Sequence, residues 1–180
     1  MPSGTKRLFL ALWPDPGTRG QLAAIQTQLA RNPSLRHAKP VSTQNIHLTL
    51  HFLGDVAESD IAQLESCLAQ VHAEPFSMVI DRWGYFPKAG VCWIGADKTP
   101  AAMTSLLEQT TVCVVDVVEN YRQPRFTPHV TLFRKARHPL EIKQIDVCEW
   151  SIDRFALVSS RTYPEGVEYT VLREWQMRQN

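Results

Sequence analysis

The chain has 180 residues, of which 44% are hydrophobic and 21% charged, and its formal net charge is +1. These values are typical of one globular domain that can fold without disulfides or a structural metal. The balanced charge argues against a protein that coats long nucleic acid, although it leaves room for a local basic pocket. No apolar run approaches the roughly 20 residues of a membrane span, and Pro14 interrupts the N-terminal apolar stretch too early for a signal peptide. We therefore expect a cytoplasmic protein without a membrane anchor.

The spacing of apolar residues predicts alternating strands and helices in the first half of the chain. The expected elements are a doubly buried strand, a helix, an alternating strand and a second amphipathic helix, over residues 6–13, 15–31, 45–53 and 59–71. Asp15 or Thr18 is expected to cap the first helix, and Gly54 with Asp55 is a turn signal at which the second strand should stop.

Strands predominate in the second half. The expected elements are a hairpin, a helix and three further strands, over residues 76–86 with 90–95, 100–118, 129–134, 150–161 and 169–175. Alternation early in the chain and strands late in the chain predict the α+β class.

The four cysteines predict neither a metal site nor a redox pair. Cys67, Cys92, Cys113 and Cys148 stand singly, without Cys-x-x-Cys spacing. A single cysteine among apolar neighbours behaves as a small buried hydrophobe. We expect four buried thiols.

One motif occurs twice, once in each half of the chain. The segment 45–52, NIHLTLHF, is echoed by the segment 127–134, TPHVTLFR. Such long-range repetition suggests two similarly built lobes that each contribute one His-x-Thr strand.

In a strand, residues i and i+2 share one face and lie roughly 6.6 Å apart. His47 is therefore expected beside Thr49, and His129 beside Thr131, with apolar residues packed behind. Two such strands side by side would place two imidazoles and two hydroxyls around one small anion. A pair of imidazoles can supply one acid and one base near neutral pH, and hydroxyls can donate to phosphate oxygens, so the pattern favours phosphoryl transfer without metal.

Two other interpretations of the motif are a solvated strand face and a metal site. His51 falls on the same expected face as His47, but about 13 Å away, too far for both to ligate one ion through bonds of roughly 2.1 Å. We expect His51 at the rim of the site, and the remaining histidines in solvent: His37, His72 and His138.

At these residues the sequence resembles the 2H phosphoesterase superfamily, and within it the bacterial RNA 2′,3′-cyclic phosphodiesterases, also called 2′–5′ RNA ligases. The similar segments are the opening strand, the first signature, a middle strand, the second signature and the closing hairpin, at residues 7–12, 47–54, 91–95, 126–134 and 159–175. Both signatures are complete, and the departures lie in aliphatic positions and loops. They leave the substrate preference open.

The resemblance implies that residues 1–180 form a single domain of two lobes related by a pseudo-twofold axis. Two antiparallel-rich sheets flanked by helices would enclose a central cleft with the two His-x-Thr strands. It also implies metal-independent hydrolysis of a terminal ribose 2′,3′-cyclic phosphate to a 2′-phosphomonoester, with reversible 2′–5′ ligation as a side reaction and no cofactor.

The same resemblance implies roles for the motif residues. Because the 3′-oxygen leaves in this reaction, His47 is assigned as general acid to that oxygen and His129 as general base on water, although pseudo-symmetry makes the two easy to exchange. Thr49 and Thr131 would hold the phosphate.

Three further residues are candidates for substrate binding. Arg134 and Arg125 can contact a phosphate or a base, and Phe9 either stacks against a base or packs into the core. The implied partner is an RNA 3′ end or a small nucleotide, with no protein partner. The alternatives are a 2H phosphodiesterase for a small cyclic nucleotide or a 2′–5′ oligoadenylate, and a non-catalytic module that binds RNA ends.

Overall fold

The structure, a computed structural model, describes residues 4–119, 121–122, 125–164 and 166–178. Its helices are α1 (Pro16–Leu29), α2 (Glu58–Leu68) and α3 (Ala101–Val117), and its strands are β1 (Thr5–Leu12), β2 (Lys39–Pro40), β3 (Leu48–Ala57), β4 (Phe76–Ile80), β5 (Arg82–Phe86), β6 (Val91–Gly95), β7 (His129–Arg134), β8 (Cys148–Ile152), β9 (Arg154–Tyr163) and β10 (Gly166–Gln176). In the described part of the chain no helix is long and apolar enough to cross a membrane.

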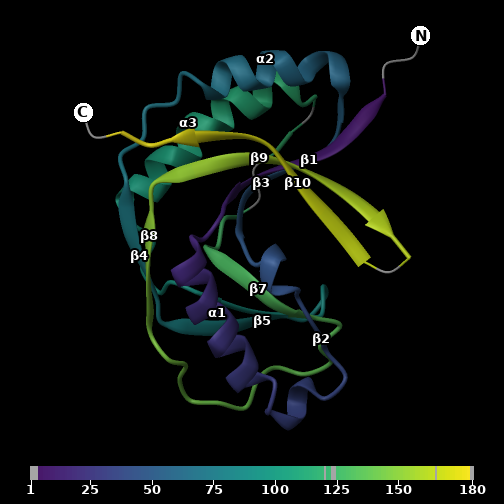
Figure 1. Ribbon diagram of the computed structural model, residues 1–180, viewed down its shortest axis with the longest axis vertical. Coiled ribbons are helices and arrows are strands. Elements are labelled where there is room, and N and C mark those ends of the chain that lie inside the picture. Colours follow the sequence, from purple (N-terminus) through teal and green to yellow (C-terminus); the bar gives the residue numbers. More distant parts are fainter. Residues whose placement is uncertain (1–3, 120, 123–124, 165, 179–180) are drawn as a thin grey trace.

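The strands form one large antiparallel sheet and one small one. Among the described residues the large sheet has eight strands, in the order β10-β9-β1-β3-β7-β6-β5 with β2 paired to β7, and the small sheet contains β4 and β8. Helices α2 and α3 pack together against β3, whereas α1 contacts β8 and reaches β7 through the hydrogen bond from Gln26 to the Leu132 carbonyl, and the β9–β10 hairpin projects away from the rest of the sheet (Figure 1). The predicted α+β class is confirmed.

The two halves of the large sheet meet where β3 pairs with β7. Leu48 lies opposite Val130 at this junction, and both side chains are fully buried. Because antiparallel pairing mirrors the flanking residues, His47 comes opposite Thr131 and Thr49 comes opposite His129. One pairing contact therefore brings the two copies of the motif together.

The first strand and the first helix form as the sequence predicts. All five residues from Leu8 to Leu12 are buried, since both faces of β1 are covered. The Asp15 side chain accepts hydrogen bonds from the backbone N–H groups of Gly17 and Thr18 at 2.8 and 3.1 Å, and Pro16 occupies the first helical turn.

Strand β3 does not stop at Gly54 and Asp55, contrary to the prediction. It continues to Ala57 because β1 pairs along its whole length, with Leu8 opposite Gly54 and Lys6 opposite Val56. Gly54 adopts a φ of 74° within the strand, a conformation that glycine adopts without strain. The glycine thus marks an irregularity in the strand.

Two predicted strands are each divided in the structure. The segment 76–86 breaks at Asp81 into β4, which pairs with β8, and β5, which pairs with β6. The segment 150–161 similarly divides at Asp153 between the small and the large sheet. The apolar pattern of each segment therefore did not indicate that the chain passes from one sheet to the other within it.

The cysteine prediction is half wrong. Cys92 and Cys148 are free and buried, as expected, but Cys67 on α2 and Cys113 on α3 form a disulfide. The two helices pack against each other and bring together residues that are 46 positions apart. Nothing in the local sequence around either cysteine indicates this approach.

Candidate active site

His47 immediately precedes β3, and its backbone surroundings fix its ring. Nδ1 lies 2.6 Å from the carbonyl oxygen of Asn45, and Nε2 lies 3.1 Å from Oγ1 of Thr49. A carbonyl oxygen only accepts hydrogen bonds, so Nδ1 carries the proton and donates it. In the neutral ring Nε2 is therefore unprotonated and accepts a hydrogen bond from the Thr49 hydroxyl.

His129, the first residue of β7, repeats this arrangement. Its Nδ1 lies 2.7 Å from the carbonyl oxygen of Thr127, again two residues earlier, and donates to it. Both imidazoles therefore have Nδ1 occupied, so that proton transfer falls to Nε2, which in His47 also accepts the hydrogen bond from Thr49.

The junction of β3 and β7 sets the separation of the two histidines. His47 and His129 are diagonal neighbours across the pair Leu48–Val130, a relationship that places such residues roughly 7–8 Å apart at the backbone. A positive charge on His129 lowers the pKa of His47, which also indicates that the rings are near each other. This separation leaves room for one phosphate between two side chains.

Burial controls the protonation of the pair. The pKa of His47 is lowered from 6.5 to about 4, chiefly by desolvation; the hydrogen bond to the Asn45 carbonyl raises it, and the charges of Arg134 and His129 lower it further. The pKa of His129 is also lowered, by desolvation first and by the Arg134 cation. Both imidazoles are therefore mostly neutral at pH 7 in the ligand-free protein, and a bound anion would raise both pKa values.

Three aromatic rings surround His47. Trp13 stacks on it with the ring centroids 5.0 Å apart and an interplanar angle of 4°, while Phe9 and Tyr169 lie at 5.1 and 5.3 Å. Phe9 is only 4% exposed, so it has no face to offer to a base and belongs to the packing around His47. Neither Trp13 nor Tyr169 is predicted as a site residue from the sequence. The position of Trp13 at the end of the first strand was the one available signal.

Two glycines allow the close packing around His129. The rings of Phe86 and Trp93 lie 5.0 and 5.9 Å from it. A Cβ added at Gly84 would come within 2.1 Å of the Trp93 indole, and one added at Gly95 would come within 2.1 Å of the Pro128 carbonyl oxygen. Both glycines are therefore needed for the observed position of His129.

A cavity of about 590 Å³ opens beside two of the four motif residues, His47 and Thr131, whereas Thr49 and His129 do not line it. Its lining includes His47, Thr131 and Arg134, together with residues of β2 and of the β9–β10 hairpin. Arg134 is exposed, and its charge acts on both histidines, which places its guanidinium near the pair. Arg125 is also exposed but does not line this cavity.

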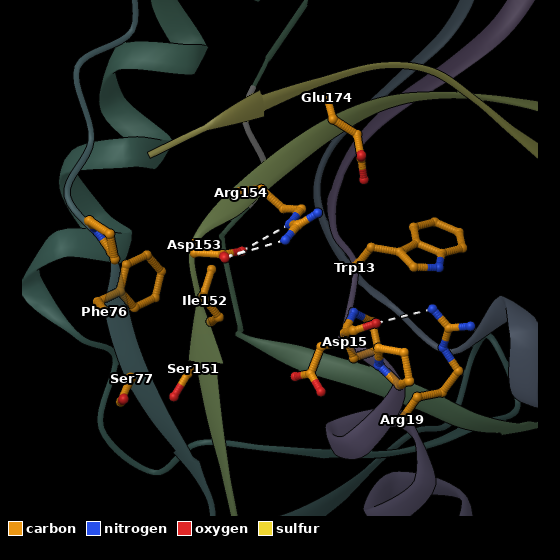
Figure 2. Close-up of a pocket in the computed structure, with 13 residues that line it drawn as sticks. Trp13, Asp15, Arg19, Phe76, Ser77, Ser151, Ile152, Asp153, Arg154 and Glu174 are labelled. Atoms are coloured by element: carbon orange, nitrogen blue, oxygen red, sulfur yellow. Dashed lines mark hydrogen bonds and ion pairs between the residues drawn. The ribbon is translucent and has the colours of Figure 1, made fainter. Parts of the chain in front are cut away.

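A second cavity, of about 640 Å³, adjoins Trp13 (Figure 2). Its charged groups are mixed, and two of its carboxylates already have partners: Asp15 caps α1, and Asp153 pairs with Arg154 at 2.9 Å. Glu174 adds a further negative charge to this wall. This cavity is less suited to a phosphate than the one beside His47.

His51 does not lie at the rim of the site, so that expectation is wrong. It is 1% exposed, with Nδ1 at 2.8 Å from the Tyr121 hydroxyl and Nε2 at 2.8 Å from the Thr110 hydroxyl. The pairing of β3 with β1 skips Leu50, and this bulge breaks the alternation between His47 and His51. The other three histidines are exposed as predicted: His37, His72 and His138. Within the described residues no cluster of three His, Cys, Asp or Glu side chains could hold a metal ion.

Comparison with known proteins agrees with this geometry. Residues 12–93 match the family model described as LigT like Phosphoesterase. A Thermus thermophilus protein named RNA 2′,3′-cyclic phosphodiesterase is 34% identical, with alignment over 96% of this chain and 90% of that protein. A protein of the same name from Thermotoga maritima is also 34% identical, over 94% and 95% of the two chains. The crystal structure of E. coli LigT complexed with phosphate has a TM-score of 0.84 and 25% identity, and the match covers 98% of this chain and all of that one (100%). On this evidence the chain belongs to the family of LigT-like phosphoesterases.

Proposed function

We propose that this protein is a metal-independent RNA 2′,3′-cyclic phosphodiesterase that opens a terminal ribose 2′,3′-cyclic phosphate to a 2′-phosphomonoester. The observation that carries the proposal is the pair of half-buried imidazoles whose Nδ1 atoms each donate to the carbonyl oxygen two residues earlier, which leaves proton transfer to Nε2. The curated relatives that carry the name of this activity align along nearly the whole chain. We also propose that residues 1–180 form a single domain made of two lobes.

His129 acts as the general base. Its neutral Nε2 takes a proton from water, and the resulting hydroxide attacks phosphorus opposite the bond to the ribose 3′-oxygen. The lowered pKa of His129 keeps the ring neutral in the free protein, which suits this role.

His47 acts as the general acid that protonates the departing 3′-oxygen. With a pKa of about 4 the ring is neutral before substrate binds, so the negative charge of the cyclic phosphate must raise this pKa for the proton to be available. Tight enclosure by aromatic rings holds the ring in place. Thr49 and Thr131 donate hydrogen bonds to the non-bridging oxygens, and Arg134 balances the charge that develops there.

The decisive experiment uses an oligoribonucleotide that ends in a 2′,3′-cyclic phosphate. We expect a product with a 2′-phosphate and a free 3′-hydroxyl, identified by chromatography against both phosphate isomers, and we expect the rate to be unchanged by EDTA. A 3′-phosphate product would contradict the assigned leaving group, and a loss of activity that added metal restores would contradict metal-independent chemistry. Binding without turnover would indicate a module that recognises RNA ends.

The same site would support 2′–5′ ligation if a 5′-hydroxyl replaced the attacking water. His129 would then deprotonate that hydroxyl, while the departure of the 3′-oxygen would be unchanged. Adding an acceptor oligonucleotide with a 5′-hydroxyl to the assay tests this, and the expected product is resistant to an enzyme that cleaves 3′–5′ linkages only.

A further inference from the structure

The cavity beside His47 extends beyond the groups that the proposed reaction requires. Its lining includes His47, Thr131 and Arg134, and also Lys39 on β2 and Tyr163 at the end of β9. Its volume of about 590 Å³ lies well inside the range of roughly 300–1,000 Å³ that is usual for ligand pockets. A phosphate and its ribose would occupy only part of this volume, so the rest is available for another part of the substrate.

The β9–β10 hairpin forms one wall of the cavity. Tyr169 lies edge-on to the His47 ring with the centroids 5.3 Å apart, and Val167 lies two residues nearer the tip, roughly 7 Å further along the same face. Tyr163, which pairs with Gly166, follows at the tip. Tyr163 and Val167 line the cavity and are 38% and 41% exposed, so they present an apolar surface on which a base can rest.

The facing wall is basic. Lys39 pairs with Arg134 across β2 and β7, and Lys135 follows directly in the chain. The described residues that line the cavity include no carboxylate, and none of these three cations forms an ion pair within the described part of the chain. The cavity therefore offers uncompensated positive charge to an anionic ligand.

The turn that carries Lys135 is held in an uncommon conformation. Lys135 has a φ of 58°, in the left-handed region that residues other than glycine rarely adopt. The next residue, Ala136, is tied down on both sides: its N–H donates to the Gly90 carbonyl at 2.9 Å, and its carbonyl accepts from the Tyr85 hydroxyl at 3.1 Å. Such a conformation persists where the surrounding structure enforces it, so the backbone of Lys135 has a fixed position at this cavity.

A terminal cyclic phosphate carries one negative charge, which Arg134 and the two histidines can balance. Lys39 and Lys135 are then left over, on the wall of the cavity that faces the exposed side chains of the hairpin. We infer that Lys39, Lys135, Tyr163 and Val167 form an outer subsite for the nucleotide that precedes the terminal one, with the lysines on its phosphate and the hairpin side chains against its base. This inference rests on the proposed function and makes an oligoribonucleotide, rather than a mononucleotide, the preferred substrate.

The test compares two substrates that end in the same group. One is adenosine 2′,3′-cyclic phosphate, and the other is a trinucleotide of adenosine that ends in a 2′,3′-cyclic phosphate. We expect kcat/KM to be at least tenfold higher for the trinucleotide in the parent protein. In the double variant Lys39→Gln, Tyr163→Ser this ratio should fall toward one, whereas Lys143→Gln, which removes an exposed cation outside the cavity, should leave the ratio unchanged.

Salt dependence gives a second readout. Each phosphate contact to single-stranded nucleic acid contributes about 0.7 to the slope of log affinity against log salt concentration. For the trinucleotide, Lys39→Gln should lower the slope of log kcat/KM by about this amount, and for the mononucleotide the slope should not change.

The outcomes separate the inference from the proposed function. Hydrolysis of both substrates at equal kcat/KM, or an equal loss on both substrates in the double variant, would overturn the outer subsite and leave the phosphodiesterase activity intact. Hydrolysis of neither substrate by the parent protein would overturn the proposed function, and the inference with it.

Discussion

The carbonyl oxygen of Asn45 accepts the Nδ1 hydrogen bond of His47 at 2.6 Å, and the side-chain amide of the same Asn45 donates to the Val167 carbonyl at 3.2 Å. Asn45 thus connects the ring of His47 to the β9–β10 hairpin that lines the cavity. At His129 the carbonyl oxygen of Thr127 likewise accepts the hydrogen bond from Nδ1. In both motifs the backbone two residues before the histidine determines which ring nitrogen faces the substrate.

Replacing either motif histidine should abolish turnover with little effect on binding. We expect His47→Gln and His129→Gln each to lower kcat by about 10²–10⁴, because each removes one proton transfer. Affinity for a 2′-phosphorylated product, measured by calorimetry, should stay within about tenfold. His138→Gln changes an exposed histidine and should have parent activity. A variant of His47 or His129 that retains a tenth of the parent kcat would refute that residue's role.

The pH dependence of kcat/KM should be bell-shaped, with its maximum on the acid side of neutrality. One imidazole must be protonated and the other neutral, and both have pKa values below 6.5 in the free protein, that of His47 being about 4. The maximum is therefore expected between about 4 and 6.5, where one proton is shared by the pair. A single sigmoid that rises to a plateau above pH 7 would show that two imidazoles do not titrate in the reaction.

Removing the positive charge of Arg134 should raise the pKa of both histidines. A nearby cation disfavours the charged imidazolium, and Arg134 lowers the pKa of His47 and of His129, so Arg134→Gln relieves both. Titration of the ring protons by NMR measures the shifts directly. Arg137→Gln removes an exposed cation that does not act on either pKa and should change neither. If Arg134→Gln also leaves both pKa values unchanged, Arg134 does not reach the pair.

Gly95→Ala should impair catalysis by displacing His129. The added Cβ would lie 2.1 Å from the Pro128 carbonyl oxygen and 3.3 Å from Cα of His129, so the backbone of β7 must move away from β6. A misplacement of about 1 Å can cost about 10²-fold in rate. We therefore expect kcat to fall with a smaller change in KM. Gly20→Ala is the control, because its added Cβ would meet open space outside the backbone of its own helix. Parent-like kcat in Gly95→Ala would show that β7 tolerates the shift.

The disulfide between Cys67 and Cys113 should contribute stability but not activity. It closes a loop of 46 residues between α2 and α3, for which about 2–4 kcal/mol of unfolding free energy is typical. Urea denaturation should show this difference between the oxidised protein and the double variant Cys67→Ser, Cys113→Ser, and reductant should destabilise the parent only. Equal stability of parent and variant, with and without reductant, would show that the bond is not formed in solution.

The local sequence determined most of the secondary structure and the residues of the two His-x-Thr motifs. Short apolar patterns predicted the two strands that carry the His-x-Thr motifs. Apolar spacing also predicted the three helices to within a few residues. Both signals come from side chains that are neighbours in the sequence. The repeated His-x-Thr pattern also identified its four residues without any knowledge of how the strands pair: His47, Thr49, His129 and Thr131.

The tertiary structure alone decided how these parts meet. Several features join residues that are distant in the chain: the pairing of Leu48 with Val130, the rings of Trp13 and Tyr169 around His47, and the disulfide. The bulge at Leu50, which turns His51 away from the site, depends on the register between two strands. Strand register and helix contacts are set by the packing free energy of the whole core, to which many side chains contribute at once. No short segment contains that information, and it becomes visible only in the folded chain.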